Sequence, residues 1–308
     1  MRKRGKNTYI KFISIVCLLL LTVLVAGCTS TTSQPTTTTV VSIPATTTAV
    51  PVKTTAASVT AIPVPNYKSS EKTLIVYTAS SLTGVSKELG TRFSAVYPGH
   101  TVVFNLAGTQ TLKTQVENGA YADVFISASN SYTNTLKSEN YFINSTVKPL
   151  TTNYVIVILP ASNPGNIQSL SDLAIPGKKI AMAAYNVPIG TASYTALANL
   201  AKSTYSQDWN KSVINNVVTF ETSESGVATK VSLGEVDAGL VYESTYAAAP
   251  AGTLTAISIP KTDNYLQTYT IGIMKQTENR GVAQEFEDFL LSGVGQEVFK
   301  DYGFRPVS

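Results

Sequence analysis

The sequence predicts an α/β fold of two lobes, each a sheet with helices packed on its faces. In the first part of the fold, helical patterns alternate with three short apolar strands, Leu74–Tyr77, Val102–Leu106 and Val124–Ile126. Such alternation is typical of parallel strands joined by crossover helices, and strands buried on both faces read as continuous apolar runs. The alternation restarts after a β-branched strand, Tyr154–Leu159, which Pro160 closes. A second lobe is therefore expected.

The remaining elements follow from apolar spacing and from turn residues. Apolar side chains three or four residues apart predict a helix over residues 82–93, and a second helix over 112–117 stops at Asn118-Gly119. Further strands are expected at Lys179–Ala183, Val217–Phe220, Ala238–Tyr242 and Tyr269–Met274. Further helices are expected to end at Leu200 and Leu233, and to span Val282–Leu291 and Gln296–Lys300.

The two lobes are expected to meet at two connecting strands. Lobe one would comprise residues 72–152 and 268–308, and lobe two would comprise residues 153–267. The connections would be the apolar runs Tyr154–Leu159 and Tyr269–Met274. The chain would thus leave lobe one, build lobe two and return.

Residues 1–28 have the pattern of a lipoprotein signal peptide. Five basic residues precede a 16-residue, mostly apolar run, Phe12–Gly27. This run is shorter than the about 20 residues of a membrane-spanning helix. The run leads into Val25-Ala26-Gly27-Cys28, which resembles the site where prokaryotic lipoproteins are cleaved and lipidated on the cysteine. The alternative is an uncleaved anchor helix. Both alternatives leave the rest of the chain outside the membrane and tethered to it.

Residues 29–71 are expected to be a disordered tether. Residues 29–65 contain 13 threonines and five prolines but no aromatic residue. Such a composition buries too little apolar area to offset the entropy lost on ordering.

Composition excludes several classes of function for the folded part. After the signal region the chain carries 18 basic and 19 acidic residues, which argues against nucleic-acid binding. Both cysteines lie within residues 1–28, and His100 is the one histidine of the chain. A disulfide framework, a cysteine metal site, a catalytic thiol and a multi-histidine zinc site are therefore excluded.

Four strand-to-helix junctions carry small or hydroxyl residues and neither lysine nor arginine. They are Ser80-Ser81, Gly108-Thr109, Ile189-Gly190-Thr191 and Ser223-Glu224-Ser225-Gly226. Ligands of open α/β sheets bind beyond the carboxyl ends of the strands, and a helix start favours an oxyanion through its unpaired N–H groups and partial positive charge. The junctions therefore predict an anion site built from neutral donors. The alternative is that each hydroxyl is an ordinary N-cap.

Five motifs, in this order, resemble those of the molybdate-binding proteins of ABC importers. They are Ala79-Ser80-Ser81-Leu82-Thr83, Ala122-Asp123-Val124-Phe125-Ile126-Ser127-Ala128, Asn186-Val187-Pro188-Ile189-Gly190, Gly239-Leu240-Val241-Tyr242 and Phe299-Lys300-Asp301-Tyr302-Gly303-Phe304. The resemblance covers residues 72–305. It implies the two-lobed type II periplasmic-binding-protein fold, in which each lobe is a mixed sheet flanked by helices and the ligand lies in the cleft.

The resemblance also implies the function. The chain is expected to be a monomer that captures molybdate or tungstate without catalysis or cofactor and delivers the anion to the permease and ATPase of an ABC importer. It would be anchored by a lipid on Cys28, at the cell surface or the periplasmic face of the cytoplasmic membrane.

The ligand-binding residues follow from the matched motifs. Ser81 would offer its hydroxyl and its backbone N–H, and Thr109 would offer its hydroxyl. Ile189 would offer a backbone N–H, and Tyr242 its phenol hydroxyl. Molybdenum or tungsten would be held through its oxo groups and not by direct metal ligation.

The fifth contact, a backbone N–H, falls at Ser223 or Glu224. This chain departs from the family pattern there, so the register is open by one residue. The Glu224 carboxylate would repel a dianion unless it points away or ligates the metal. Because the Asn186–Gly190 motif has no acidic residue, simple tetrahedral binding is expected. Separately, Asp123 is expected to have a structural role and not to contact the ligand.

Other functions remain as alternatives. The same fold could bind sulfate or another oxyanion, since four-oxygen dianions differ chiefly in size. A serine hydrolase or β-lactamase-like enzyme is suggested only by an S-x-x-K string, Ser69–Lys72. His100 lies beside a Pro-Gly turn and is expected to be a solvated loop residue, not a member of a catalytic triad. A purely adhesive surface protein would not need junctions lined with hydroxyl groups.

Overall fold

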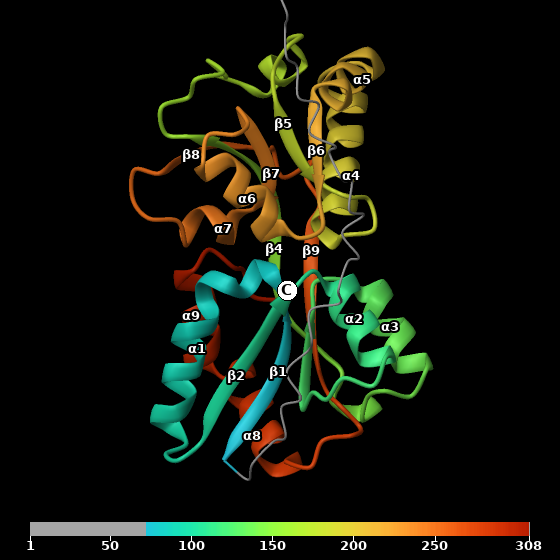
Figure 1. Cartoon of the computed structure of the whole chain (residues 1–308), viewed down its shortest axis with the longest axis vertical. Helices are drawn as coiled ribbons and strands as arrows, with labels where there is room; N and C mark the ends of the chain where they lie inside the picture. The colour runs from blue at the N-terminus through green and yellow to red at the C-terminus, as the bar shows by residue number, and fades with distance from the viewer. Residues whose placement is uncertain (1–71, 308) are drawn as a thin grey trace, which may run out of the picture. The chain divides into compact units, whose positions relative to one another are not determined.

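The computed structural model describes residues 72–307 (Figure 1). The predicted signal peptide with its lipidation site Cys28, and the predicted tether over residues 29–71, lie outside the described residues. Nine strands are joined in the order β2-β1-β3-β9-β4-β7-β5-β6, with β8 paired to β4. This order separates the strands into two lobes that meet at β9 and β4.

The first lobe is a mixed sheet. Strand β1 (Thr73–Ala79) lies between β2 (Thr101–Ala107) and β3 (Val124–Ser127), and both neighbours run parallel to it. Strand β9 (Leu266–Ile273) pairs antiparallel with β3. The helices of this lobe are α1 (Thr83–Val96), α2 (Thr109–Glu117), α3 (Asn130–Ser138), α8 (Arg280–Leu291) and α9 (Gly293–Asp301).

Strand β1 is buried on both faces, as its continuous apolar sequence predicts. Leu74 and Val76 belong to the larger core cluster with residues of α1, α8 and α9. Ile75 and Tyr77 point to the other face, into a second cluster with residues of α2 and α3. Alternate side chains of one strand therefore hold helices on opposite faces of the sheet.

The second lobe repeats the plan with different connections. Strand β5 (Ile180–Ala183) lies parallel between β6 (Val217–Glu221) and β7 (Ala238–Tyr242). Strand β8 (Leu254–Ser258) pairs antiparallel with β4. Figure 1 shows the helices of this lobe beside these strands: α4 (Pro188–Ser203), α5 (Gln207–Asn215), α6 (Glu224–Ser232) and α7 (Glu243–Ala247).

Strand β4 (Lys148–Pro160) runs from one lobe into the other. It pairs with β9 as far as Tyr154 and with β7 from Val155 onward. The predicted lobe boundaries, 152/153 and 267/268, remain predictions, and this change of partner lies next to the first of them.

The strand predicted at Tyr154–Leu159 begins six residues earlier in the structure, at Lys148. The added residues include Thr151 and Asn153, which are polar but fully buried. The Thr151 hydroxyl donates to the carbonyl of Arg305 over 2.8 Å, and the Asn153 amide donates to the Ser244 hydroxyl over 2.8 Å. Tertiary hydrogen bonds thus satisfy a polar stretch that carries no apolar strand signal.

Apolar spacing did not predict two of the helices, because each of them buries only two side chains. Helix α3 buries Thr133 and Leu136, and helix α5 buries Trp209 and Val213. Each begins with a serine N-cap whose hydroxyl accepts a hydrogen bond from the first turn, so capping was the signal available for them. Helix α7 and strand β8 are five residues each and were also not predicted.

Candidate functional site

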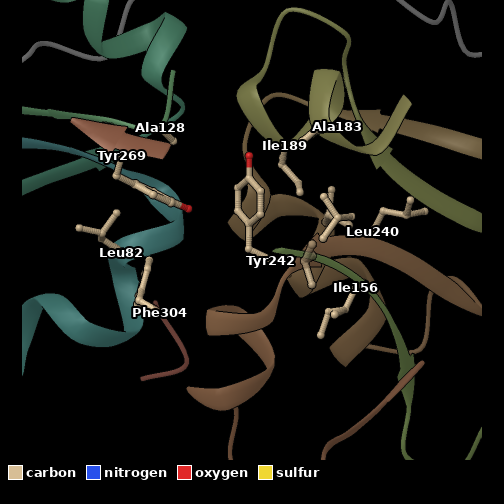
Figure 2. Close-up of a cluster of buried hydrophobic side chains, with 14 of the residues drawn as sticks. Leu82, Ala128, Ile156, Ala183, Ile189, Leu240, Tyr242, Tyr269 and Phe304 are labelled. Atoms are coloured by element: carbon tan, nitrogen blue, oxygen red, sulfur yellow. The ribbon is translucent and has the colours of Figure 1, made fainter. Parts of the chain in front are cut away.

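The five residues predicted to bind the ligand line one pocket between the lobes. Ser81 and Thr109 come from the first lobe, and Ile189, Glu224 and Tyr242 come from the second. Figure 2 shows Tyr242 and Ile189 from the second lobe across from Tyr269 and Ala128 of the first. Four strand-to-helix junctions that are far apart in the sequence therefore meet at one place.

The pocket is small, and the lobes touch beside it. The centre of a water molecule can move through about 10 Å³ within the pocket, which is about the space that one water needs. The Gln110 amide donates to the carbonyl of Thr222 across the lobes over 2.7 Å. The Tyr132 hydroxyl donates to the carbonyl of Asn186 over 2.5 Å. The described structure is therefore a closed form.

Ser81 lies in a 3₁₀ turn, Ser80–Leu82, directly after β1. This turn begins after Ala79, which has no side chain that could cap it. The Tyr269 hydroxyl donates to Ser81 Oγ over 2.9 Å. Since Tyr269 supplies the proton of that bond, the Ser81 hydroxyl keeps its own proton for a partner in the pocket.

Thr109 is the first residue of α2, and the residue before it, Gly108, cannot cap the helix. Its hydroxyl oxygen accepts a hydrogen bond from the backbone N–H of Ala128 over 3.2 Å. Ala128 follows β3, so the backbone at the end of the third strand of the lobe fixes the Thr109 side chain. The Thr109 hydroxyl proton stays available to a ligand.

Ile189 lies in the first turn of α4, after Pro188 at the start of the helix. The preceding residue, Val187, provides no side-chain cap, so the N–H groups of this turn have no such partner. A Cβ at Gly190 would lie 2.0 Å from the carbonyl oxygen of Ala184, at the end of the preceding strand. Only glycine allows this approach, and it sets the helix start against the pocket.

The helix starts distinguish the two interpretations of the junctions, an anion site or an ordinary N-cap. The turns at Ser81, Thr109 and Ile189 begin without a side-chain cap. At the fourth junction the hydroxyl is an ordinary N-cap, because Ser223 Oγ accepts a hydrogen bond from the N–H of Gly226 over 3.2 Å.

Glu224 is the first residue of α6, and its side chain is buried in the pocket wall. Its Oε1 accepts hydrogen bonds from Tyr242 N over 2.8 Å and from the Thr245 hydroxyl over 2.5 Å. Burial raises the pKa of Glu224 to about 7, although the hydrogen bonds lower it in part. The carboxyl therefore lines the pocket and does not point away from it.

Tyr242 ends β7 and is 1% exposed. Its hydroxyl donates to Gln267 Oε1 over 3.2 Å. The ring packs edge-on against Tyr269, with ring centroids 6.0 Å apart. Burial holds the pKa of both phenols well above 10, so both are neutral donors at ordinary pH.

The pocket wall carries no cation within residues 72–307. Among the described residues that line it, Glu224 is the one carboxyl, and the other predicted donors are hydroxyl and N–H groups. Three further residues that sequence reasoning missed support the site: Tyr269 and Ala128 hold the hydroxyls, and Thr245 holds the Glu224 carboxyl.

Two other polar residues lie outside the pocket. The Asp123 carboxylate accepts from Ile75 N over 2.8 Å and from the hydroxyls of Tyr121 and Thr277, so its predicted structural role is confirmed. His100 Nδ1 faces Glu285 at 3.3 Å, and its ring stacks on Phe93. Neither residue is part of the pocket lining among the described residues.

Among residues 72–307, no helix combines the length and the apolar character that crossing a membrane demands. The same residues contain no group of three or more His, Cys, Asp or Glu side chains arranged to hold a metal ion.

Comparison with known proteins gives the family. Residues 74–305 match the family described as bacterial extracellular solute-binding protein. The chain is 29% identical over 233 residues to the molybdate-binding protein ModA of Mycobacterium tuberculosis, which covers 76% of this chain and 84% of that protein. Two solved structures share the fold. The periplasmic molybdate-binding protein of Azotobacter vinelandii has a TM-score of 0.66 at 21% identity, over 76% of this chain and 100% of that one.

The second is the sulfate-binding protein SubI of Mycobacterium tuberculosis, with a TM-score of 0.66 at 16% identity, over 77% of this chain and 88% of that one. Both likenesses confirm the predicted two-lobed type II fold. Since the family match spans nearly all of the described residues, the chain belongs to the bacterial extracellular solute-binding proteins.

Proposed function

We propose that this protein captures a small tetrahedral oxyanion, molybdate or tungstate, and delivers it to the permease and ATPase of an ABC importer. The observation that carries the proposal is the convergence of donors from both lobes on one small pocket without a cation. Neutral donors match a compact anion by direction and number, and helix starts add their partial positive charge. The similarity to ModA supports molybdate as the ligand.

The anion would be held by five groups. Ser81, Thr109 and Tyr242 would donate from their hydroxyls, and Ile189 and Glu224 from their backbone N–H groups. The metal would be bound through its oxo groups. Tyr242 would turn its proton from Gln267, its present acceptor, to the anion.

Binding and closure would be coupled. Each lobe holds only part of the donor set, so an anion gains the full set only when the lobes close. The contacts from Gln110 to Thr222 and from Tyr132 to Asn186 would form together with the bound state. The permease would then recognise the closed protein.

Selectivity would follow from the fixed number of donors. An anion too small to reach all of them leaves buried N–H or O–H groups unpaired, each at about 1–3 kcal/mol. Sulfate is the alternative ligand, because the sulfate-binding protein SubI shares the fold. A serine hydrolase is not favoured, because His100 lies against Glu285 and not at a junction serine.

Anchoring completes the proposal. Cleavage and lipidation at Cys28 would hold the monomeric protein at the cell surface or at the periplasmic face of the cytoplasmic membrane, near its permease. A Cys28→Ala variant would then lose its membrane association, which fractionation of cells measures. Retention of that variant in the membrane would favour the uncleaved anchor helix.

A thermal-shift series tests the ligand. The purified protein, freed of bound anions, is heated with molybdate, tungstate, sulfate or phosphate. A ligand present at about one hundred times its Kd adds roughly 2.7 kcal/mol to the free energy of unfolding. We expect this gain with molybdate or tungstate at the lowest concentrations. A gain with sulfate alone would make sulfate the ligand, and no shift with any of the four would remove the proposal.

A further inference from the structure

We propose that Glu224 meets the anion as a neutral carboxylic acid whose Oε2 donates a hydrogen bond, so that capture of a dianion takes up one proton. This inference rests on the proposed function, because it concerns the same pocket. It gives the Glu224 side chain a role beyond the backbone N–H that the resemblance implies. The role is one of regulation and selectivity by proton linkage.

The carboxyl group is fixed on one side and open on the other. Oε1 accepts from Tyr242 N and from the Thr245 hydroxyl, which orients the group. Oε2 is buried and has no hydrogen-bond partner within the described part of the chain. Glu224 is 2% exposed and lines the pocket. Buried polar atoms without partners are rare in folded proteins, so Oε2 is positioned for a group that enters the pocket.

The surroundings favour the neutral acid. Burial is the largest influence on this carboxyl and raises its pKa to about 7, and the hydrogen bonds from Thr245 and Tyr242 offset only part of that rise. Ser81 Oγ faces the carboxyl from the other lobe without forming a hydrogen bond to Oε2 within the described residues. No cation of the described residues lines the pocket, so no opposite charge there offsets the cost of burying the ionised form.

Other titratable groups near α6 do not change this balance. Tyr242 of β7 and Tyr269 of β9 stay neutral, because burial holds their pKa well above 10. Glu221 of β6 accepts a hydrogen bond from Thr219, and Glu243 of α7 is ion-paired with Arg305. The ring of Tyr154 of β4 lies under the cations of Lys261 and Arg305. Strand β5 has no titratable residue.

The negative charge of the dianion then requires that Glu224 carry a proton when the ligand is bound. An ionised Oε2 would face an oxygen of a dianion in a pocket without cations, and like charges there repel strongly. A protonated Oε2 donates to that oxygen and adds one neutral donor to the set. The proton comes from solvent, stays on the carboxyl and returns to solvent on release.

This linkage has a measurable consequence. Below about pH 6 the free protein already carries the proton, so the Kd for a dianion is independent of pH. Above about pH 7 each binding event must take up a proton, and the Kd rises about tenfold per pH unit. Because the Kd rises with pH, the protein would release the anion more readily at higher pH.

Titration calorimetry with molybdate tests the inference on the whole protein. Measurements at about pH 6, 7, 8 and 9 give the Kd, and two buffers with different ionisation enthalpies at about pH 8 give the number of protons taken up. We expect close to one proton per anion at pH 8 and a rise of about fiftyfold in Kd from pH 7 to 9, because half of the carboxyls are still protonated at pH 7. The wild-type result stands without any variant.

Glu224→Gln is the informative variant, because its amide donates the same hydrogen bond but cannot gain a proton. We expect no proton uptake, a Kd that varies less than threefold from pH 6 to 9, and tighter binding than wild type at pH 9. Glu221→Gln is the matched control, since Glu221 lies outside the pocket wall on the adjacent strand. It should keep the wild-type pH dependence.

Three outcomes would overturn the inference. A wild-type Kd that is constant from pH 6 to 9 without proton uptake would do so and leave the proposed function in place. A folded Glu224→Gln protein that binds no molybdate would show that the ionised carboxylate is needed, as in direct ligation of the metal. A wild type that binds no molybdate, tungstate or sulfate even at pH 6 would overturn the proposed function as well.

Discussion

The hydroxyl of Tyr269 donates a hydrogen bond to Ser81 Oγ over 2.9 Å, between residues 188 positions apart in the chain. Tyr269 is fully buried on β9, one of the strands at which the lobes meet, and Ser81 lies at the end of β1. Figure 2 shows the Tyr269 ring reaching from the first lobe toward Tyr242 of the second. A strand at the lobe junction thus orients a hydroxyl of the anion pocket.

Removing that orienting bond tests its role. Tyr269→Phe should weaken oxyanion binding about three- to tenfold, because the Ser81 hydroxyl loses the donor that fixes its oxygen. The free energy of unfolding should fall by about 1 kcal/mol, the usual worth of one hydrogen bond. Calorimetry and chemical denaturation measure the two effects. Unchanged binding would show that Ser81 needs no positioning.

Ser81→Ala should weaken binding more than Tyr269→Phe does. The change removes a hydroxyl donor to a charged ligand, and such hydrogen bonds contribute about 1.5–3 kcal/mol, or roughly ten- to hundredfold in Kd. Ser86→Ala is the control, because Ser86 is buried on α1, outside the pocket wall, and its hydroxyl donates to the Leu82 carbonyl. Equal affinities for Ser81→Ala and Ser86→Ala would remove Ser81 from the site.

Tyr242→Phe should also weaken binding roughly tenfold or more, while the protein stays folded. The phenol is neutral and buried, and its proton is the part that a ligand would use. The change also leaves Gln267 Oε1 without its donor, so a loss of about 1 kcal/mol in stability is expected. Fluorescence or calorimetric titration with molybdate checks the affinity. A variant that binds as tightly as wild type would limit Tyr242 to a packing role.

Gly108→Ala should hinder closure of the lobes. Its Cβ would lie 2.6 Å from the carbonyl oxygen of Thr222 in the opposite lobe, and the backbone φ of −58° allows any residue. We expect at least about fivefold weaker binding, or about 1 kcal/mol, and a more expanded protein with ligand by small-angle scattering. Gly281→Ala is the control, since a Cβ there meets nothing within 4 Å. Identical behaviour of the two variants would argue against closure through this contact.

Glu224 should make the stability of the ligand-free protein depend on pH. Its folded-state pKa of about 7 lies above the ordinary 4.5, so the folded protein holds this proton more tightly than the unfolded chain does. The contribution to stability is therefore complete below about pH 4.5 and is lost as the pH rises through about 7. The upper limit of the loss is about 3 kcal/mol.

Chemical denaturation at several pH values compares wild type with Glu224→Gln. The wild type should lose stability relative to the variant between about pH 5 and 8, because only the wild type has an ionised group at the buried position 224 at the higher pH. Parallel stability profiles for the two proteins would mean that the Glu224 carboxyl ionises freely in the folded state.

The sequence predicted the strands well where burial alone decides them. The apolar runs at β1, β3 and β7 match their strands closely, because both faces of these strands are covered. The first half of β4 could not be predicted, since Thr151 and Asn153 are buried through bonds to residues more than ninety positions away. Only the folded topology brings those partners together.

The site divides in the same way. Ser81, Thr109, Ile189, Glu224 and Tyr242 could be chosen because local motifs mark the junctions, and the structure brings all five to one pocket. Tyr269 could not be chosen, because nothing in its own strand shows which junction lies beside it. The sequence does not decide whether the Glu224 side chain points away or ligates the metal, since its orientation depends on Tyr242 and Thr245 of the following strand and helix.

A crystal structure of the protein with molybdate tests the central claim most directly. We predict one anion between the lobes, with its oxygens within hydrogen-bond distance of Ser81 Oγ, Thr109 Oγ1, Ile189 N and Tyr242 Oη at once. Donors from both lobes on a single ion would establish capture by closure. A pocket that stays without the anion, or that holds it against one lobe alone, would contradict the account.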